Sequence, residues 1–325
     1  MQKNRFGRTG LQISRIVMGT GNVGGLFTDS GKGTEQFSVV KQGLSAGINW
    51  IDTAPQYGDK NSERNLGKVL RQMDEIPHVS TKVRLEQEDL GNIPAAIERS
   101  LRSSLERLQL NKVALLQLHN DLSDQPGKRN LAVHHIFREG GVLEGMENLH
   151  QLGLTDYIGF TAKGQSEACL EVARSGMFDT AQVYYNMLNP SAGQDMPKKW
   201  TGQDFQNLIG ACQSHDMGVM AIRVLAAGVL ASDNRTGRES VLTENTCLDE
   251  EERKAQALFQ TLHSRRSQVH LALQFALSHE GVSCAIVGIS ETKHLTEAVA
   301  ALTAPPLDAH EFEQLRRLYE SDFRS

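Results

Sequence analysis

Short apolar runs alternate along this chain with longer amphipathic stretches. The runs are rich in β-branched and aliphatic residues, and they predict eight strands at about 13–19, 48–53, 78–83, 113–119, 156–161, 179–185, 218–224 and 283–289. Most of the runs are apolar on both faces, which is typical of parallel strands buried between a core and a layer of helices.

The stretches between these runs predict crossover helices. In the clearest of them, 92–110, aliphatic residues from Ile93 to Leu108 recur at helical spacing with charges on the opposite face. Further helices are predicted at 34–47, 62–73, 144–153, 204–215 and 292–302. Polar stretches near 120–130, 189–203 and 231–249 are too short and too varied to be disordered linkers, so they are expected to be loops over a site.

Eight βα units joined by right-handed crossovers can close into a barrel. We therefore predict one α/β domain over residues 1–325, a (β/α)8 TIM barrel preceded by a short N-terminal β-hairpin that could plug the barrel floor. An open doubly wound sheet is the alternative. It would use the GxGxxG spacing of Gly19, Gly21 and Gly24, but no capped helix follows that turn directly.

Composition and charge exclude several classes of partner. The net charge is -5 and the basic residues are scattered, so no nucleic-acid partner is expected. The first residues lack the apolar core of a signal peptide, and no run is long enough to span a bilayer, so we expect a cytoplasmic protein without a membrane partner. The four cysteines stand far apart, which argues against a zinc or redox motif.

Four polar residues, Asp52, Tyr57, Lys82 and His119, stand at or just beyond the C-terminal ends of three predicted strands. In a parallel α/β protein these ends open onto one crevice. A tyrosine phenol ionises only near pH ~10 in water, so it exchanges protons at neutral pH only with a cation nearby. Lys82 could be that cation, held by Asp52, while His119 could bond the substrate oxygen. Together they predict an acid/base device aimed at an oxygen atom.

Each of these four residues, taken alone, also has a purely structural interpretation. Asp52 could cap a loop, Tyr57 could pack at the rim, Lys82 could be solvated, and His119 could be a satisfied buried histidine. Their arrival in order at successive strand ends favours the chemical interpretation. No metal site is predicted, because only Asp52 and His119 qualify as ligands and a lysine stands beside them.

The stretch GINWIDTAPQYGDKNSERNLGKVL (47–70) resembles the signature of the aldo-keto reductases. Other segments resemble the same family in order along nearly the whole chain: RFGRTGLQIS with MGTGNVGG, STKV, SLERLQLNKVALLQLH, QVYYN and AIVGISETKHLTEA. The resemblance implies an NAD(P)-dependent oxidoreductase that reduces aldehydes and ketones, or oxidises aldoses and other alcohols. Tyr57 would be its general acid and base, Lys82 and Asp52 would tune that phenol, and His119 would orient the substrate carbonyl.

The resemblance also implies a cofactor site across the barrel mouth. Gly19 and Thr20 would lie on the nicotinamide side, and Thr161 and Gln182 would hold the carboxamide. Arg223 would meet the cofactor pyrophosphate or a substrate acid, or form a salt bridge at its strand end. The adenosine phosphate end would be held by the segment from Gly288 to Glu297, which includes Ser290, Lys293 and His294.

Three residues depart from the family pattern at that site. Ala162 stands where the family usually has an asparagine, Ile222 where many members have an aromatic or small residue, and His294 where many have an arginine that grips the 2′-phosphate of NADP. Family habit favours NADP(H), and NAD(H) remains the alternative.

The substrate is expected to be a small carbonyl compound or alcohol. Phe27, Asn120 and Trp200 are the predicted residues of its pocket, whereas Trp50 is predicted to pack in the barrel core. The alternative function is a non-catalytic, cofactor-binding regulatory subunit of the same fold.

Overall fold

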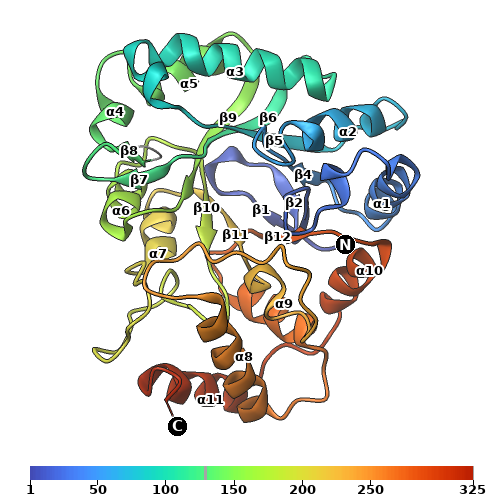
Figure 1. The fold of residues 1–325 in the computed structure, drawn as a ribbon, viewed down its shortest axis with the longest axis vertical. Coiled ribbons are helices and arrows are strands. Elements are labelled where there is room, and N and C mark those ends of the chain that lie inside the picture. Colours follow the sequence, from blue (N-terminus) through green and yellow to red (C-terminus); the bar gives the residue numbers. More distant parts are fainter. Residues whose placement is uncertain (128–129, 325) are drawn as a thin grey trace.

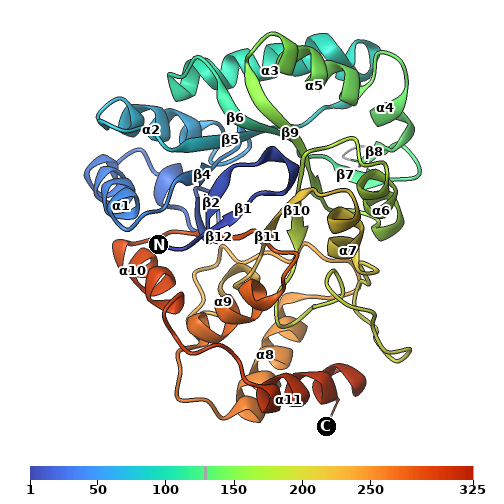
Figure 2. The ribbon, with the colours of Figure 1, turned by 180° about the vertical axis from the view of Figure 1, so that it is seen from behind.

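The computed structural model describes residues 1–127 and 130–324. Eight parallel strands close into a barrel with helices around it, as Figures 1 and 2 show, which confirms the predicted (β/α)8 fold. The strands are β3 (Ile16–Gly19), β4 (Trp50–Asp52), β5 (His78–Val83), β6 (Val113–Leu118), β9 (Thr155–Ala162), β10 (Thr180–Tyr184), β11 (Gly218–Ile222) and β12 (Cys284–Gly288). Each barrel strand pairs with the next one along the chain, and β12 pairs with β3 to close the barrel.

The outer layer consists of α-helices that follow the strands. They are α1 (Gly33–Ser45), α2 (Asn61–Leu70), α3 (Ile93–Leu108), α4 (His134–Phe137), α5 (Val142–Gln151), α6 (Ser166–Arg174), α7 (Leu208–Ser214), α8 (Leu248–Leu262), α9 (Gln268–Ser278), α10 (Thr292–Ala301) and α11 (Ala309–Glu320). The six helices predicted from amphipathic periodicity are all present. Periodicity did not predict α4, α6, α8, α9 and α11. For α9 the reason is that it is buried on most of its surface and carries no polar stripe.

An N-terminal hairpin closes the floor of the barrel, as predicted. Strand β1 (Lys3–Arg5) pairs antiparallel with β2 (Gln12–Ser14), and the ring of Phe6 meets that of Trp50 edge-on, with centroids 5.4 Å apart. Gly7 has φ +51°, and a Cβ atom there would lie 2.2 Å from the Gly218 nitrogen, so only glycine fits at this close approach. Trp50 therefore packs in the core, as the sequence predicted.

Two of the predicted loops are partly regular. In and just after the loop at 120–130, the strands β7 (Asp121–Ser123) and β8 (Asn130–Ala132) form a small parallel sheet beside the barrel that the sequence did not predict, because three-residue strands leave no periodicity to detect. The predicted loop 231–249 is irregular as far as residue 247, and its last two residues begin α8. In the described ranges, no helix combines the length and apolar character that a bilayer crossing requires.

We expect the change Phe6→Ala to lower the free energy of unfolding by about 3–5 kcal/mol, because the ring is fully buried between the hairpin and the barrel floor. Phe137→Ala is the matched control, since that ring is 37% exposed, and it should cost about 1 kcal/mol or less. Urea denaturation of the three proteins measures the difference. Equal losses for the two variants would contradict a packed floor.

Candidate active site

A buried polar cluster lies in the barrel around Asp52, the last residue of β4, whose side chain is almost inaccessible to solvent. Its Oδ2 atom accepts a hydrogen bond from Lys82 Nζ at 2.6 Å. Its Oδ1 atom accepts bonds from Ser80 Oγ at 2.7 Å and from Gln182 Nε2 at 2.8 Å. Because side chains along a strand alternate between faces, Ser80 and Lys82 both reach inward from β5. The carboxylate is thus held from two other strands.

Lys82 joins this carboxylate to the tyrosine. Its ammonium donates to Asp52, to the carbonyl oxygen of Thr53 at 2.9 Å and to Tyr57 Oη at 3.1 Å, so all three of its protons have acceptors. Burial lowers the pKa of Lys82, but the negative charge of Asp52 and the contact with Tyr57 more than offset this, and the pKa lies above its usual value. A permanent cation therefore touches the phenol oxygen.

His119 follows β6 and faces the same phenol. The rings of His119 and Tyr57 are perpendicular, with centroids 6.0 Å apart. Burial, and then the positive charges of Lys82, Lys163 and Arg84, lower the pKa of His119 well below its usual value. The imidazole is therefore neutral at neutral pH.

The side chain of Gln56 lies against this neutral imidazole. Its Oε1 atom is 3.2 Å from His119 Nδ1. An amide oxygen can only accept a hydrogen bond, so in this orientation the imidazole proton is on Nδ1 and Nε2 is an acceptor. If the amide rotates by 180°, its NH2 group donates to Nδ1 and the proton is on Nε2, where it can be donated to a substrate oxygen.

The structure thus brings together all four acid/base residues that the sequence singled out. Sequence reasoning missed three residues that support them: Ser80, Gln117 and Gln56. Gln117 donates to Asp52 Oδ1 over a longer 3.4 Å. Ser80 and Gln117 stand two positions before Lys82 and His119, so the two-residue period of a strand could have placed both on the inner face.

The predicted cofactor residues lie along one continuous side of the barrel mouth. Gly19 ends β3 and Gly288 ends β12, and the two pair in register. Thr20 follows Gly19, and its hydroxyl donates to the Asp52 carbonyl oxygen at 3.0 Å. Thr161 and Gln182 pair in register on β9 and β10, although Gln182 also has the bond to Asp52 that the sequence did not predict.

The remaining predicted cofactor residues lie near the start of α10. Ser290 precedes the helix, and Lys293, His294 and Glu297 lie within its first two turns. Lys293 Nζ forms an exposed ion pair with Glu291 at 3.0 Å, and this partner lowers the pKa of the Glu291 carboxyl. An acidic side chain therefore stands at the helix N-terminus, where the resemblance expects the adenosine end of the cofactor.

The three predicted substrate residues have structural contacts of their own. Phe27 is buried in the hydrophobic core. The Asn120 side chain accepts a bond from the Leu85 backbone nitrogen and donates to the Leu85 carbonyl, at 2.9 and 2.8 Å. Trp200 packs edge-on against Tyr319 of α11, with centroids 6.3 Å apart. A role in substrate binding stays a prediction for all three.

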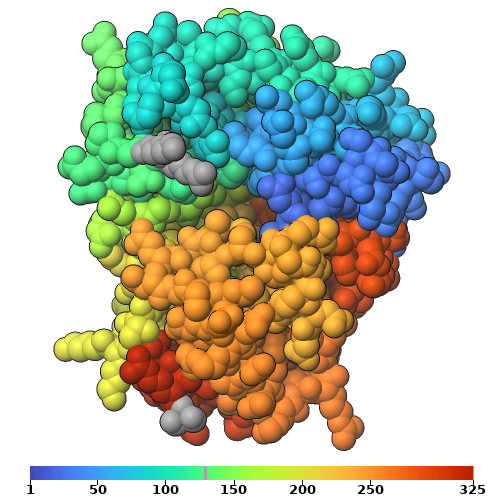
Figure 3. Space-filling view, in the orientation of Figure 1, coloured from blue at the N-terminus to red at the C-terminus, as the bar shows by residue number. Residues whose placement is uncertain are grey.

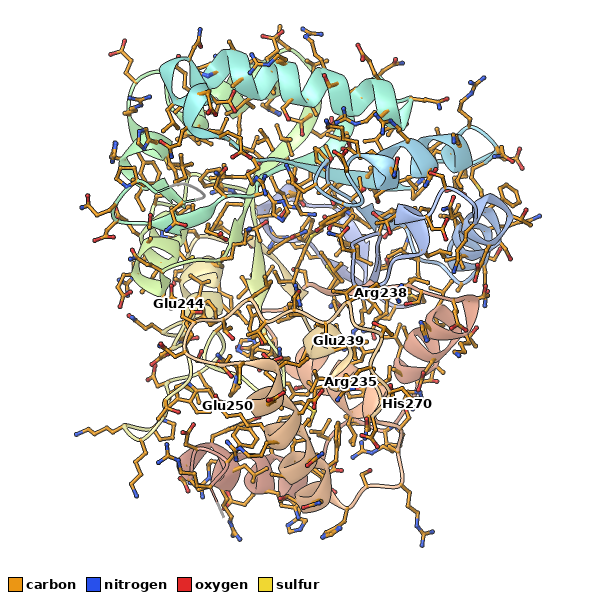
Figure 4. The ribbon with its side chains drawn as sticks, viewed as in Figure 1. Arg235, Arg238, Glu239, Glu244, Glu250 and His270 are labelled. Atoms are coloured by element: carbon orange, nitrogen blue, oxygen red, sulfur yellow. The ribbon has the colours of Figure 1, made fainter. Side chains whose placement is uncertain are left out.

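The segment 231–247, which we call the strap, runs across the face of the barrel that carries these residues. In Figure 4, Arg238 and Glu244 lie at opposite sides of this face, with Glu239 between them. A Cβ atom at Gly25, in the loop after β3, would lie 2.8 Å from Arg238 Nη1, and the backbone nitrogen of Glu244 donates to Gln203 Oε1 at 3.0 Å. Figure 3 shows the orange residues of this region directly below the cyan and blue ones.

Arg223, just after β11, binds the strap at Ser240. Its guanidinium donates to the carbonyl oxygen of Ser240 at 2.5 Å and to the Ser240 hydroxyl at 3.2 Å. Among the described residues it has no acidic partner, so the salt bridge that the sequence left open is not formed there. Burial lowers the pKa of Arg223, and the charges of Tyr184, Tyr57 and Glu251 oppose that shift. The guanidinium therefore lies close enough to Tyr57 for the two groups to interact electrostatically.

Glu251, in the first turn of α8, is a buried acid that the sequence did not single out. Its Oε1 atom accepts a bond from Tyr184 Oη at 3.3 Å. Burial raises its pKa to about 7, although Tyr184, Arg223 and Lys254 act in the opposite direction. No pattern in the sequence relates Glu251 to Tyr184 and Arg223, because an irregular segment separates Glu251 from the strands that carry them.

The hydroxyl of Thr161 is available to a bound amide. In the described part of the chain, three buried side-chain atoms on the barrel strands have no hydrogen-bond partner: Thr161 Oγ1, Gln117 Oε1 and Thr180 Oγ1. Thr180 begins β10 and Gln117 is bonded to Asp52, whereas Thr161 is near the C-terminal end of β9. A buried polar atom without a partner costs free energy, so the Thr161 hydroxyl favours a ligand with a polar group at the mouth. The carboxamide of a nicotinamide carries such a group, and the residues present at the mouth therefore suit that cofactor.

Comparison with known proteins decides the family. A model of the aldo/keto reductase family matches residues 15–320. This chain belongs to the aldo-keto reductase family. It is accordingly an oxidoreductase, as its resemblance to that family implied.

Individual relatives are similar over most of their length. L-galactose dehydrogenase of Arabidopsis thaliana is 27% identical over 305 residues, which cover 92% of this chain and 87% of that protein. Pyridoxal 4-dehydrogenase of Microbacterium luteolum is 24% identical over 335 residues, covering 92% of each. Among solved structures, the holo form of an aldo-keto reductase from Bacillus halodurans superposes with a TM-score of 0.74 at 25% identity, covering 98% of this chain and 96% of that one.

We expect the stability of this reductase to depend on pH through Glu251. The folded carboxyl has a pKa of about 7, above the value near 4.5 of an exposed glutamate, so the proton it holds stabilises the fold fully below pH ~4.5, and that contribution is lost as pH rises through 7. Glu251→Gln, which cannot ionise, should keep roughly 2–3 kcal/mol that the wild type loses between pH 5 and 8.

Thermal or urea unfolding across this pH range measures the effect. Glu171→Gln, on the exposed face of α6, is the control and should follow the wild type. Parallel pH profiles for all three proteins would mean that Glu251 ionises normally in the folded state.

Proposed function

We propose that this aldo-keto reductase transfers hydride between a nicotinamide cofactor and a small carbonyl or alcohol substrate, with Tyr57 as general acid and base. The observation that carries the proposal is the 3.1 Å contact between Lys82 Nζ and Tyr57 Oη, made while Asp52 holds the same ammonium at 2.6 Å. A phenol beside a fixed cation can release and regain a proton at one defined atom.

In the direction of reduction, the substrate oxygen lies between Tyr57 Oη and the His119 ring. The cofactor, when bound, supplies the hydride and in the reverse direction accepts it. As the substrate oxygen gains negative charge, Tyr57 gives it the phenol proton, and Lys82 stabilises the phenolate that remains. In alcohol oxidation the phenolate takes that proton back.

His119 then positions the substrate instead of supplying the proton. Its imidazole is neutral, because burial and three nearby cations oppose its protonation. With the Gln56 amide rotated so that its NH2 group faces Nδ1, the imidazole proton is on Nε2, which donates one hydrogen bond to the substrate oxygen and fixes the carbonyl beside the phenol.

The cofactor contacts proposed for this chain follow the continuous side of the barrel mouth. Gly19 and Thr20 would lie beside the nicotinamide, and Thr161 and Gln182 would hold its carboxamide. Arg223 would meet an acidic group, and the adenosine end would be held between Gly288 and Glu297 by Ser290, Lys293 and His294. The unpaired hydroxyl of Thr161 supports the carboxamide assignment most directly.

We propose NADP(H) as the preferred cofactor, with NAD(H) as the alternative. Lys293 and His294 are the basic side chains at the start of α10 that a 2′-phosphate could contact. Glu291 pairs with Lys293 and reduces its pull on that phosphate, so the preference is expected to be small. Two relatives are named as dehydrogenases of L-galactose and of pyridoxal, and for this reason both reaction directions belong in the assay.

Tyr57→Phe should lower kcat by about 10²–10⁴-fold, since it keeps the ring but removes the hydroxyl that gives its proton to the substrate and accepts a bond from Lys82. Turnover of an aldehyde panel with NADPH, followed by nicotinamide absorbance, measures the loss, and fluorescence titration should show unchanged NADPH binding. If the wild type binds NADPH but reduces no aldehyde and oxidises no alcohol, the regulatory-subunit alternative is favoured. Unchanged turnover in Tyr57→Phe would exclude the proposed mechanism.

His294→Arg should raise kcat/KM for NADPH by about tenfold and leave that for NADH nearly unchanged, because a guanidinium can bind a 2′-phosphate through two parallel hydrogen bonds. Steady-state rates with both cofactors measure the ratio. The control is His310→Arg, on the exposed start of α11, which should alter neither value. An equal gain with both cofactors would place position 294 away from the 2′ position.

A further inference from the structure

Two basic residues stand on either side of His119 at the barrel mouth. Arg84 follows β5, His119 follows β6 and Lys163 follows β9, and these three strands are neighbours in the barrel (Figures 1 and 2). Lys82 points inward at Asp52, so with the two-residue alternation of a strand Arg84 is the next inward position on β5. The mechanism above gives neither basic side chain a contact with the substrate.

The register of the strands places Arg84 level with His119 and Lys163 two positions further along on the other side. Val83 pairs with Leu118, so the residues that follow them, Arg84 and His119, are lateral neighbours. Leu118 also pairs with Phe160 on the other side. Thr161, the next residue, pairs in register with Gln182, which faces the barrel interior. Lys163 follows Thr161 by two positions and is therefore expected on the same inward side.

Backbone and side-chain hydrogen bonds fix both basic residues to the segment that carries His119. The Asn120 amide bonds both backbone groups of Leu85, which holds the end of β5 beside the end of β6. The backbone nitrogen of Leu122 donates to the Lys163 carbonyl oxygen at 2.8 Å. The position of Arg84 and Lys163 relative to His119 is therefore built into the fold.

Their charges point toward the site. The charged groups that lower the pKa of His119 are all cations, namely Lys82, Lys163 and Arg84. The acidic partners lie further out: Asp121 is 38% exposed against 19% for Lys163, and Glu86 is 48% exposed against 37% for Arg84. The mouth beside His119 is therefore positive on its inner side.

We propose that Arg84 and Lys163 bind an anionic group of the substrate, so that this reductase prefers carbonyl compounds that carry a carboxylate or a phosphate. This inference rests on the proposed function, because it places the carbonyl at Tyr57 and His119. The Arg84–Glu86 pair and the acidic side of the Lys163–Asp121 pair are open to solvent, and ion pairs in contact with water contribute little free energy, so a substrate anion can replace the acidic partners at small cost. Arginine additionally offers a planar fork that fits a carboxylate.

The kinetic test compares substrates of equal shape and different charge. The substrates are para- and meta-formylbenzoate and the corresponding neutral formylbenzamides, with NADPH as cofactor. Arg84→Met and Lys163→Met should each lower kcat/KM for the benzoates about tenfold, mainly through KM, and change the amides less than about twofold. Arg84→Lys should retain most of the preference. Arg102→Met, an exposed change on α3, should match the wild type.

A binding test needs no turnover. Calorimetric titration with para-(hydroxymethyl)benzoate should show about tenfold weaker binding to each Met variant, whereas binding of the amide and of NADPH should not change. A wild type that reduces none of these aldehydes refutes the proposed function, and the titration still tests the anion site. The inference is wrong if the Met variants lose kcat/KM equally for benzoates and amides, or lose none for either. It is also wrong if they weaken only the binding of NADPH, which would assign Arg84 and Lys163 to the cofactor phosphates.

Discussion

The buried ion pair between Asp52 and Lys82 is the interaction on which the rest of the site depends. Removing two charges from water costs several kcal/mol per ion, and their attraction offsets this only when the remaining hydrogen-bonding capacity is also filled. Here Ser80 and Gln182 complete the carboxylate, and the Thr53 carbonyl and Tyr57 complete the ammonium. Well-packed apolar residues would stabilise a barrel as well, so the pair is best understood through the phenol that it serves.

This pair also links the chemistry to closure of the barrel. Asp52 comes from β4, Lys82 and Ser80 from β5, and Gln182 from β10 across the interior. These bonds hold only if the C-terminal ends of β4, β5 and β10 keep a constant distance from one another. At the opposite end of β4, the hairpin packs Phe6 against Trp50 and holds the strand in place. The same Trp50 donates its indole N–H to Ser80 Oγ at 3.0 Å, so the packed floor and the acid/base cluster share one chain of contacts.

The sequence could predict those parts of the site that follow from strand periodicity. Asp52, Lys82 and His119 stand at or next to strand ends, and Tyr57 follows Asp52 by five residues. Because every second residue of a strand faces inward, the same periodicity would also have located Ser80 and Gln117. The strap and Glu251 could not be found this way. Their place over the mouth depends on single contacts, such as Arg223 with Ser240 and Tyr184 with Glu251, between segments that no repeating pattern relates. Helix α9 could not be predicted for another reason: it is buried on most sides and lacks the polar stripe by which amphipathic periodicity is recognised.

The charges at the mouth bear on both proposals, the roles of Tyr57 and His119 and the preference for anionic substrates. Burial, and then the charges of Lys82, Lys163 and Arg84, oppose protonation of His119, so in the proposed mechanism it is Tyr57 that gives a proton to the substrate oxygen. A carboxylate on the substrate would partly cancel the charges of Arg84 and Lys163 while leaving Lys82, which Asp52 already neutralises, unaffected. The field that keeps the histidine neutral would then also attract the substrate, and the acid/base pair deeper in the barrel would work independently of what binds at the rim.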